Sequence, residues 1–350
     1  DGFGAFERAE VAAAGALIDY LELTQKGNLP RLAPPRRGRA GTRVEIDPAT
    51  RRNLELTQTL AGGRKGSLLS VIDLTCTGAG ARLLAARLAA PLTDPVAINA
   101  RLDAVAYFVG VETLRGDLRA VLGRLPDLER ALTRLSLGRG GPRDLIAIRG
   151  GLEGAREIAR MLAMPGDLAA PPPPVAALEK DIGHFSALIE TLGQALVADP
   201  PLLARDGGFI AAGYTADLDH LRGLHDESRR LIAALQARYV DETGIAALKI
   251  KHNNILGYYI DVSATHADKL FTHDRFIHRQ TMANGARFTT VELGELERDL
   301  SAAGDKALAL EQTLFADLVA ACLAEAPAIG VTAAALAGLD VASALAELAV

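Results

Sequence analysis

The stretch "LKIKHNNILGYYIDV", residues 248–262, breaks the pattern of the chain around it. Its apolar residues alternate with polar ones in two runs, at Leu248, Ile250, Tyr258, Ile260 and Val262. Asn253-Asn254 and Gly257, residue types that favour turns, lie between the runs. A period of two on both sides of a turn predicts an antiparallel hairpin.

Apolar residues on both sides of this hairpin recur with a period near 3.6, which is typical of helices. A helix of about 25 residues is marked by Leu218, Leu221, Leu224, Leu231, Leu235 and Tyr239, and one of more than 30 by Leu293, Leu296, Leu300, Ala303, Ala307, Leu310, Leu314 and Leu318. At about 1.5 Å per residue, these helices span roughly 40 and 50 Å. The predicted fold is mainly α: a helical core with two long helices that pack as an antiparallel pair and carry one small antiparallel sheet, within about residues 245–290, inserted between them.

Further helices are expected in the rest of the chain. Residues 7–25 form one, Thr77 caps another, and Asp94 precedes a first-turn proline. Pro126 and Pro142 are also expected in first turns. After the break "APPPPV" (170–175), one continuous helix is expected from the apolar stripe Leu178, Ile182, Phe185, Ile189, Leu192 and Leu196.

The charge of the chain is unevenly distributed. Its formal net charge of −5 argues against a generally basic surface for nucleic acid. Residues 248–288, which we call the β island, nevertheless carry six Lys/Arg against three acids, so this window is +3 and the remainder −8. Trp is absent and aromatic residues are sparse, so alanine and leucine supply most of the packing, which suits helices.

Sequence signatures of catalysis are missing. In "AGGRKGSLL" (61–69) Lys65 precedes Gly66, whereas a P-loop needs lysine directly after the second glycine, so a surface turn before a helix is expected. No Ser-centred elbow and no zinc-binding His pair occurs, although four of the seven histidines lie in the β island. The chain is therefore not expected to be an enzyme by itself, nor to hold a cofactor or metal.

The compartment is expected to be the cytoplasm. Cys76 and Cys322 stand singly in apolar helical contexts, which indicates reduced thiols. No run approaches 18 uninterrupted apolar residues and the N-terminus does not resemble a signal peptide, so no membrane association is expected. The chain also begins without Met, which suggests a piece of a longer protein.

The second half of the β island, "RFIHRQTMANGARFTT" (275–290), is rich in cations and uncharged donors. Such side chains suit phosphate oxygens, which accept hydrogen bonds without regard to base sequence. The competing interpretation is an ordinary solvated surface, because +3 over 41 residues is a modest excess. Phe276 and Phe288 are expected to form the small core of the island and not to stack on bases.

Many segments resemble, in order and spacing, the MutS family of DNA mismatch repair proteins. They are "IDPATRRNLELTQTLAGGRKGSLLSVIDLTCTGAGARLL" (46–84), "PLTDPVAINARLDAV" (91–105), "LPDLERALTRL" (125–135), "GPRDL" (141–145), "RDGGFIAAGYTADLDHLR" (205–222), "TGIAALKIKHNNILGYYIDV" (243–262), "RQTMANGARFTTVEL" (279–293) and "KALALEQTLFADL" (306–318). The resemblance covers essentially the whole chain but only the middle of the family, which consists of a helical core with levers and a clamp domain.

The resemblance implies a division into a helical core with the first lever segment (1–210), a clamp domain with the lever ends (211–298), and the returning lever with the end of the core (299–350). It implies that the clamp grips double-stranded DNA through the phosphate backbone, non-specifically, in a nucleoid-associated, cytoplasmic protein. In the full-length family a homodimer encircles DNA, and ATP and Mg belong to an ATPase domain with a P-loop, a motif that this chain lacks. The family's mismatch-reading Phe-x-Glu is also missing, since "AFER" (5–8) has no residue between Phe6 and Glu7.

Five candidate backbone-binding residues follow from the resemblance: Asn253 in "KHNNILGYY", and Arg279, Gln280, Thr281 and Asn284 in "RQTMANGARF". The charge of the island adds Lys251, Arg275 and Arg287. The chain departs from the family pattern "QTLKNAERY" at Ala283, where many relatives have Lys, and at Gly285, which replaces Ala. Loss of the cation is expected to weaken the grip, and Gly285 to loosen the local helix or turn.

Three alternatives remain open. The first is a helical scaffold whose β island docks a protein partner. The second is an enzyme whose site has no recognisable motif, and the third is a MutS relative that acts in recombination. Salt-insensitive binding that ignores the charges of Arg279 and Arg287 would favour the scaffold, and nucleotide turnover would favour the enzyme.

Overall fold

The computed structural model describes residues 6–25, 32, 35, 41–163, 170–253 and 255–350. Packing divides the chain into two units, Asp1–Leu203 with Ala316–Val350 (unit 1) and Ala204–Phe315 (unit 2). These units follow contacts within the chain, whereas the boundaries expected above follow the domains of the resembled family. The expected boundaries therefore stay a prediction.

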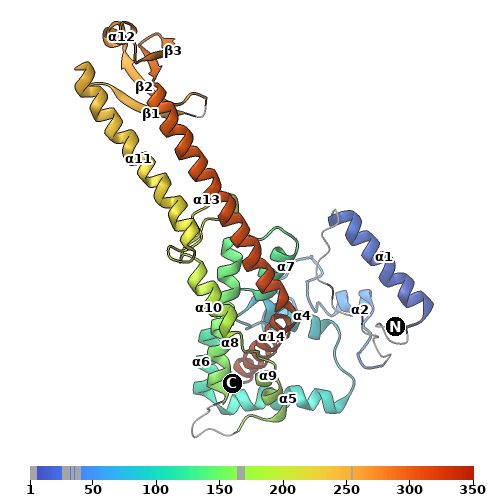
Figure 1. Cartoon of the computed structure of the whole chain (residues 1–350). Coiled ribbons are helices and arrows are strands. Elements are labelled where there is room, and N and C mark those ends of the chain that lie inside the picture. The colour runs from blue at the N-terminus through green and yellow to red at the C-terminus, as the bar shows by residue number, and fades with distance from the viewer. Residues whose placement is uncertain (1–5, 26–31, 33–34, 36–40, 164–169, 254) are drawn as a thin grey trace. The chain divides into compact units, whose positions relative to one another are not determined.

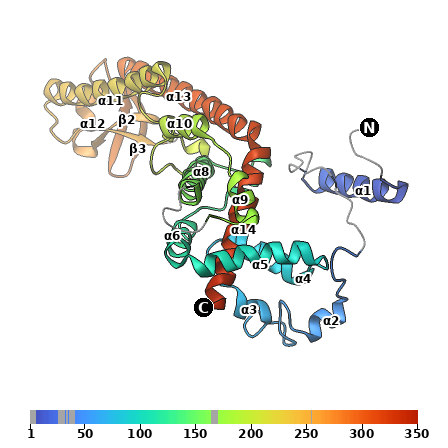
Figure 2. The same cartoon turned by 90° about the horizontal axis from the view of Figure 1, so that it is seen from below.

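Unit 1 is a helical body in which α14 (Ala326–Ala349) packs against α4 to α9. Figure 2 shows α14 running beside α4 and α5. The helices of this unit that precede α14 are α1 (Arg8–Gln25), α2 (Pro48–Asn53), α3 (Leu68–Ile72), α4 (Gly78–Ala89), α5 (Pro95–Gly110), α6 (Glu112–Leu122), α7 (Leu128–Ser136), α8 (Pro142–Ala163), α9 (Pro173–Lys180) and α10 (Ser186–Ala195). Because α14 is apolar nearly all round, it can be buried on several faces at once.

Asp340 joins α14 to the start of α4. Its carboxylate is fully buried and accepts hydrogen bonds from the backbone amides of Cys76 and Thr77, both at 2.8 Å, and from the Thr77 hydroxyl at 2.6 Å. Thr77 in turn accepts from the amide of Gly80 at 2.9 Å and so caps α4. The charge of Asp340 is thus stabilised by donors at a helix N-terminus, where a negative charge is favourable.

Several local expectations for unit 1 are confirmed. Thr77 and Asp94 are N-caps and Pro142 begins α8. The glycine-rich segment 61–69 forms a turn before α3, with Gly62 and Gly66 at positive φ and Ser67 as the N-cap. Cys76 and Cys322 are free thiols.

Two local expectations are wrong. Asp127, not the residue before Pro126, caps α7, because its side chain accepts from the amide of Arg130 and the helix begins only at Leu128. The stripe from Leu178 to Leu196 is interrupted between α9 and α10. Here the Gly183 amide donates to the Thr332 hydroxyl on α14 at 2.9 Å, a partner 149 residues away that replaces a helical one.

Unit 2 contains the predicted pair of long helices, α11 (Ala216–Thr243) and α13 (Val291–Ala324), whose residues up to Phe315 belong to this unit. Figure 1 shows them side by side. They are antiparallel: Arg238 pairs with Glu292 near one end, and Arg222 pairs with Glu311 at 2.6 Å near the other. The lever pairing predicted from the two apolar stripes is confirmed.

A four-stranded antiparallel sheet connects α11 to α13, as predicted. It consists of β1 (Lys249–Asn253), β2 (Gly257–Ser263), β3 (Ile277–Met282) and β4 (Gly285–Thr289) in the order β1-β2-β4-β3, with α12 (Ala264–Phe271) between β2 and β3. The predicted hairpin is β1-β2, in which Ile250 lies opposite Ile260. Asn254, which was expected in its turn, lies outside the described residues.

One apolar cluster joins the sheet to the helices. Tyr239 of α11, Ile260 of β2, Phe288 of β4, Leu270 of α12 and Leu293 of α13 are all fully buried in it. Burial of each large apolar side chain contributes about 1.5–3 kcal/mol, so the cluster fixes the sheet to the helix ends. Phe276 and Phe288 belong to this core, which confirms the role expected for them.

Two helices are long and apolar enough to cross a membrane, α13 with a mean hydropathy of 1.6 and α14 with 1.7 over 18 residues. In α14, 72% of this 18-residue window is buried within the structure, whereas in α13 the buried share is 17%. Buried core helices of globular proteins meet the same criteria, so this is weak evidence for a membrane span.

Candidate nucleic-acid interface

The sheet of unit 2 has one apolar and one polar face, because successive side chains of a strand point to opposite sides. Ile250, Ile260 and Phe288 belong to the face with the core. The alternate positions make up what we call the polar face, and the strand register places together Lys249, Lys251, Tyr259, Asp261, Gln280 and Arg287. The polar face thus extends over all four strands and carries three cations, Lys249 and Lys251 on β1 and Arg287 on β4.

Arg287 lies in the middle of the polar face. Its guanidinium is 4.5 Å from the centre of the Tyr259 ring, and its Nη1 donates to the Gln280 side chain at 2.9 Å. Its Nε is buried without a hydrogen-bond partner in the described structure. A guanidinium that lies over an aromatic ring loses little further rotamer freedom on binding, which suits it to a phosphate.

Lys251 is engaged with a neighbouring acid on the same face. Its Nζ donates to the carboxylate of Asp261 on β2 at 2.6 Å, and this bond raises the pKa of Lys251. The lysine side chain is 50% exposed, so solvent screens the pair. A phosphate must therefore compete with Asp261 for this cation.

Arg275 lies before β3 and holds the sheet to the helices. It pairs with Glu242 of α11 at 2.8 Å and with Glu292 of α13 at 3.2 Å, and it lies 5.6 Å from the centre of the buried Tyr239 ring. With two carboxylates already bound, this arginine is better placed to stabilise the module than to bind phosphate. The structure does not bring it together with the polar face.

The remaining candidates on β3 lie along an exposed edge strand. Every residue of β3 is exposed, and the pairing of β3 with β4 shifts by one residue at Arg279, a β-bulge. No hydrogen bond or ion pair of the Arg279 side chain is found in the described part of the chain. Thr281 instead bonds the ring of His278 at 2.9 Å. Arg279 is thus an accessible cation beside the polar face.

Two further candidates belong to turns. The Asn253 side chain accepts from the amides of Ile255 at 3.0 Å and Leu256 at 2.8 Å, so it shapes the end of β1. Asn284 is exposed in the turn between β3 and β4, and its carbonyl accepts from the amide of Ala264. The turn also carries the exposed Ala283.

Gly285 is closely packed, and the loosening expected from it stays a prediction. It begins β4, and a Cβ at this position would collide with the carbonyl oxygen of Val262 on β2. Glycine therefore allows β2 and β4 to approach each other directly after the turn.

Lys249 and Tyr259 were not among the candidate residues predicted from the sequence. Both share the polar face with Lys251, one at the start of β1 and the other paired with Lys251 across the hairpin. The period of two that predicted the hairpin also assigns these positions to one face, so it was the available signal.

Groups of three or more His, Cys, Asp or Glu side chains that could hold a metal ion are absent among the residues that the structure describes. What the polar face offers chemically is a set of fixed donors on a small rigid sheet. Such an arrangement can bind an extended polyanion.

Two long antiparallel helices joined by a small antiparallel sheet place the chain in the class of mainly helical proteins with an inserted β module. The family model described as MutS domain III matches residues 49–346. The chain belongs to the MutS family.

Its curated relatives are bacterial proteins named DNA mismatch repair protein MutS. The chain is 54% identical to that of Paracoccus denitrificans (strain Pd 1222), 56% to that of Cereibacter sphaeroides (strain ATCC 17023) and 52% to that of Rhodopseudomonas palustris (strain BisB5). All of this chain is covered, but only 40%, 40% and 38% of the relatives. The chain thus spans about two fifths of the length of these relatives.

Proposed function

We propose that this chain is the DNA-gripping and lever region of a mismatch repair protein. It binds the phosphate backbone of double-stranded DNA without sequence preference, and α11 and α13 connect this contact to an ATPase domain elsewhere in the full-length protein. ATP and Mg belong to that domain, and the full-length protein acts as a cytoplasmic, nucleoid-associated homodimer. The observation that carries the proposal is the polar face, where Arg287 on β4 lies between Lys249 on the edge strand β1 and the accessible Arg279 on the opposite edge strand β3.

The electrostatics of the island limit the strength of this contact. Lys251 is paired with Asp261, and Arg275 with Glu242 and Glu292. Among the described residues on or beside the polar face, Lys249, Arg279 and Arg287 form no ion pair with a carboxylate, although Asp261 lies opposite Lys249 and Arg287 in the sheet. We therefore expect about two to three phosphates to be neutralised. The predicted dissociation constant lies in the non-specific range of about 10⁻⁴ to 10⁻⁶ M at physiological salt, or weaker.

The test is a salt series of fluorescence anisotropy titrations with a labelled 30-base-pair duplex, fully matched or with one central G·T mismatch. We expect equal binding of both duplexes and a log–log salt slope of about −0.9 per neutralised phosphate. Discrimination of the mismatch, or binding that ignores salt, would refute a contact made by phosphates alone. Salt-insensitive capture of a protein would favour the scaffold alternative.

Arg279→Ala should weaken binding to all duplexes alike and make the slope shallower by about one. The matched control is Arg230→Ala on the exposed surface of α11, which removes the same charge outside the sheet. Ala283→Lys adds a cation at the β3-β4 turn and should strengthen binding and steepen the slope. Equal losses for Arg279→Ala and Arg230→Ala would show that only net charge matters.

A further inference from the structure

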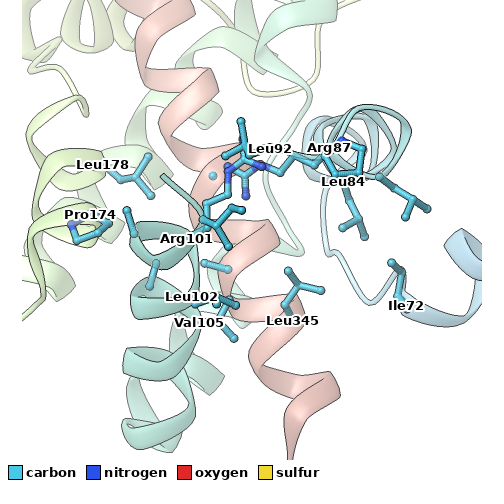
Figure 3. A pocket seen from close by; sticks show the side chains of 17 residues that line it. Ile72, Leu84, Arg87, Leu92, Arg101, Leu102, Val105, Pro174, Leu178 and Leu345 are labelled. Atoms are coloured by element: carbon cyan, nitrogen blue, oxygen red, sulfur yellow. The ribbon is translucent and has the colours of Figure 1, made fainter. Parts of the chain in front are cut away.

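Unit 1 contains an apolar cavity of about 550 Å³ that has no part in the proposed DNA contact. It lies among α4, α5, α9 and α14 (Figure 3). Its walls are aliphatic, and the lining side chains include Leu84, Leu102, Val105, Leu178 and Leu345. The volume lies within the range of about 300–1,000 Å³ that is typical of ligand pockets.

Two arginines reach into this cavity without a carboxylate. Figure 3 shows Arg87 of α4 and Arg101 of α5 converging beside Leu92. The Nε atom of Arg87 is buried and has no hydrogen-bond partner in the described structure. Burial, and then the charge of Arg101, lower the pKa of Arg87 to about 10. No acidic side chain is among the described residues that line the cavity.

A third arginine adds to this positive charge. Arg43 pairs with Leu92 through an isolated backbone bridge. The pKa of Arg101 is lowered by burial and then by the charge of Arg43. Charges that lose contact with water are unfavourable unless paired, so the partly buried Arg87 and Arg101, with the exposed Arg43 nearby, form a site that an anion would stabilise. A carboxylate is suited to it, since a guanidinium can donate two parallel hydrogen bonds to its oxygens.

The distribution of apolar surface narrows the choice of anion. In Figure 3 the arginines lie between Pro174 and Leu178 on one side and Leu84 and Ile72 on the other. A fatty acid carries its carboxylate at one end, whereas a peptide can carry one in the middle with apolar side chains on both sides. Aromatic residues are missing from the described lining, so nucleic-acid bases have no ring to stack on.

We propose that this cavity binds an acidic, apolar peptide segment of a partner protein. A glutamate or aspartate of the segment bridges Arg87 and Arg101, and its flanking aliphatic side chains fill the space on both sides.

The test uses the whole 350-residue chain and two fluorescein-labelled peptides, Ser-Leu-Leu-Glu-Leu-Leu-Ser and its matched control with Gln in place of Glu. We expect the Glu peptide to bind roughly 10- to 100-fold more tightly, because hydrogen bonds to charged groups are the stronger ones. Arg87→Gln and Arg101→Gln should each remove most of this difference. Arg160→Gln, an equal charge change at an exposed position of α8, should leave it unchanged.

Ala100→Phe provides a second test that keeps both arginines. Ala100 lines the cavity, so the larger ring should fill it and abolish binding of both peptides. Circular dichroism checks that each variant is folded, and loss of folding in one arginine variant leaves the other and Ala100→Phe as tests. Equal affinity for the Glu and Gln peptides, or an Arg87→Gln variant that still prefers Glu, would overturn the proposal. Tight binding of octanoate without binding of either peptide would also overturn it.

Discussion

Replacing Glu311 by alanine should release the loop before α11 from α13. Glu311 is 4% exposed, and its carboxylate accepts from the amides of Gly208 at 2.7 Å and Ile210 at 3.2 Å. It also accepts from Arg222 of α11 at 2.6 Å. One side chain thus joins the loop, α11 and α13 near one end of the helix pair.

The magnitude follows from what the substitution leaves behind. Removing one partner of a buried charge pair costs about 3–5 kcal/mol, because the other charge stays without compensation. Arg222 is 29% exposed, so water can solvate part of it and the lower end of this range applies. The two amides lose their acceptor as well, at about 1–3 kcal/mol for each one that stays buried. We therefore expect a total of at least about 3 kcal/mol, which equals roughly a 10²-fold change in a local opening equilibrium.

Hydrogen exchange read by mass spectrometry is the appropriate assay, since two packed units need not unfold in a single transition. In Glu311→Ala, amides of residues 207–214 should exchange at least about 10² times faster, whereas those of β2 and β4 change little. The matched control is Gln312→Ala, the exposed neighbour on the same helix. Unchanged protection of residues 207–214 would refute the role assigned to Glu311.

Three further outcomes are expected. Gly257→Ala should weaken the β1-β2 hairpin by about 1–3 kcal/mol, because φ at this residue is +67° and the new Cβ would collide with the Glu297 carboxylate. Unaltered hydrogen exchange of the amides of residues 249–263 would contradict this. Asp340→Ala should lower the urea midpoint of unit 1, since two part-buried amides lose a buried acceptor, at up to about 1–3 kcal/mol each. The check is circular dichroism, and an unchanged midpoint would show that the network contributes nothing. At pH 8 iodoacetamide should modify the half-buried Cys76 long before the fully buried Cys322. Burial raises the pKa of both thiols, but that of Cys322 to about 12, which leaves a thiolate fraction of about 10⁻⁴. Equal labelling rates by mass spectrometry would contradict this difference in burial.

The secondary structure of unit 2 could be predicted because its signals are local. The period of two at residues 248–262 identifies a hairpin and its core face, and the observed pairing of Ile250 with Ile260 agrees. The apolar stripes on both sides identify two long helices whose ends must meet at the sheet. The helix N-caps Thr77 and Asp94 could also be predicted from the sequence, since a cap depends on the residues directly after it.

Partners that are distant in sequence could not be predicted in the same way. The amide of Gly183 is satisfied by Thr332, so an apolar stripe that reads as one helix is two. The site shows the same limit. Composition identified Lys251, Arg275 and Arg287 as equivalent cations, but the structure gives each a different neighbour.

Lys251 faces Asp261 across a hairpin, Arg275 joins acids of two helices, and Arg287 lies on the ring of Tyr259. The sequence by itself determined which segments form helices and strands and that the β island carries the cations, because propensity and periodicity act over a few residues. Only the tertiary structure decided which of these cations pair with carboxylates. Ion pairs and ring contacts act over a few ångströms, and it is the packing of the elements that brings such partners within reach.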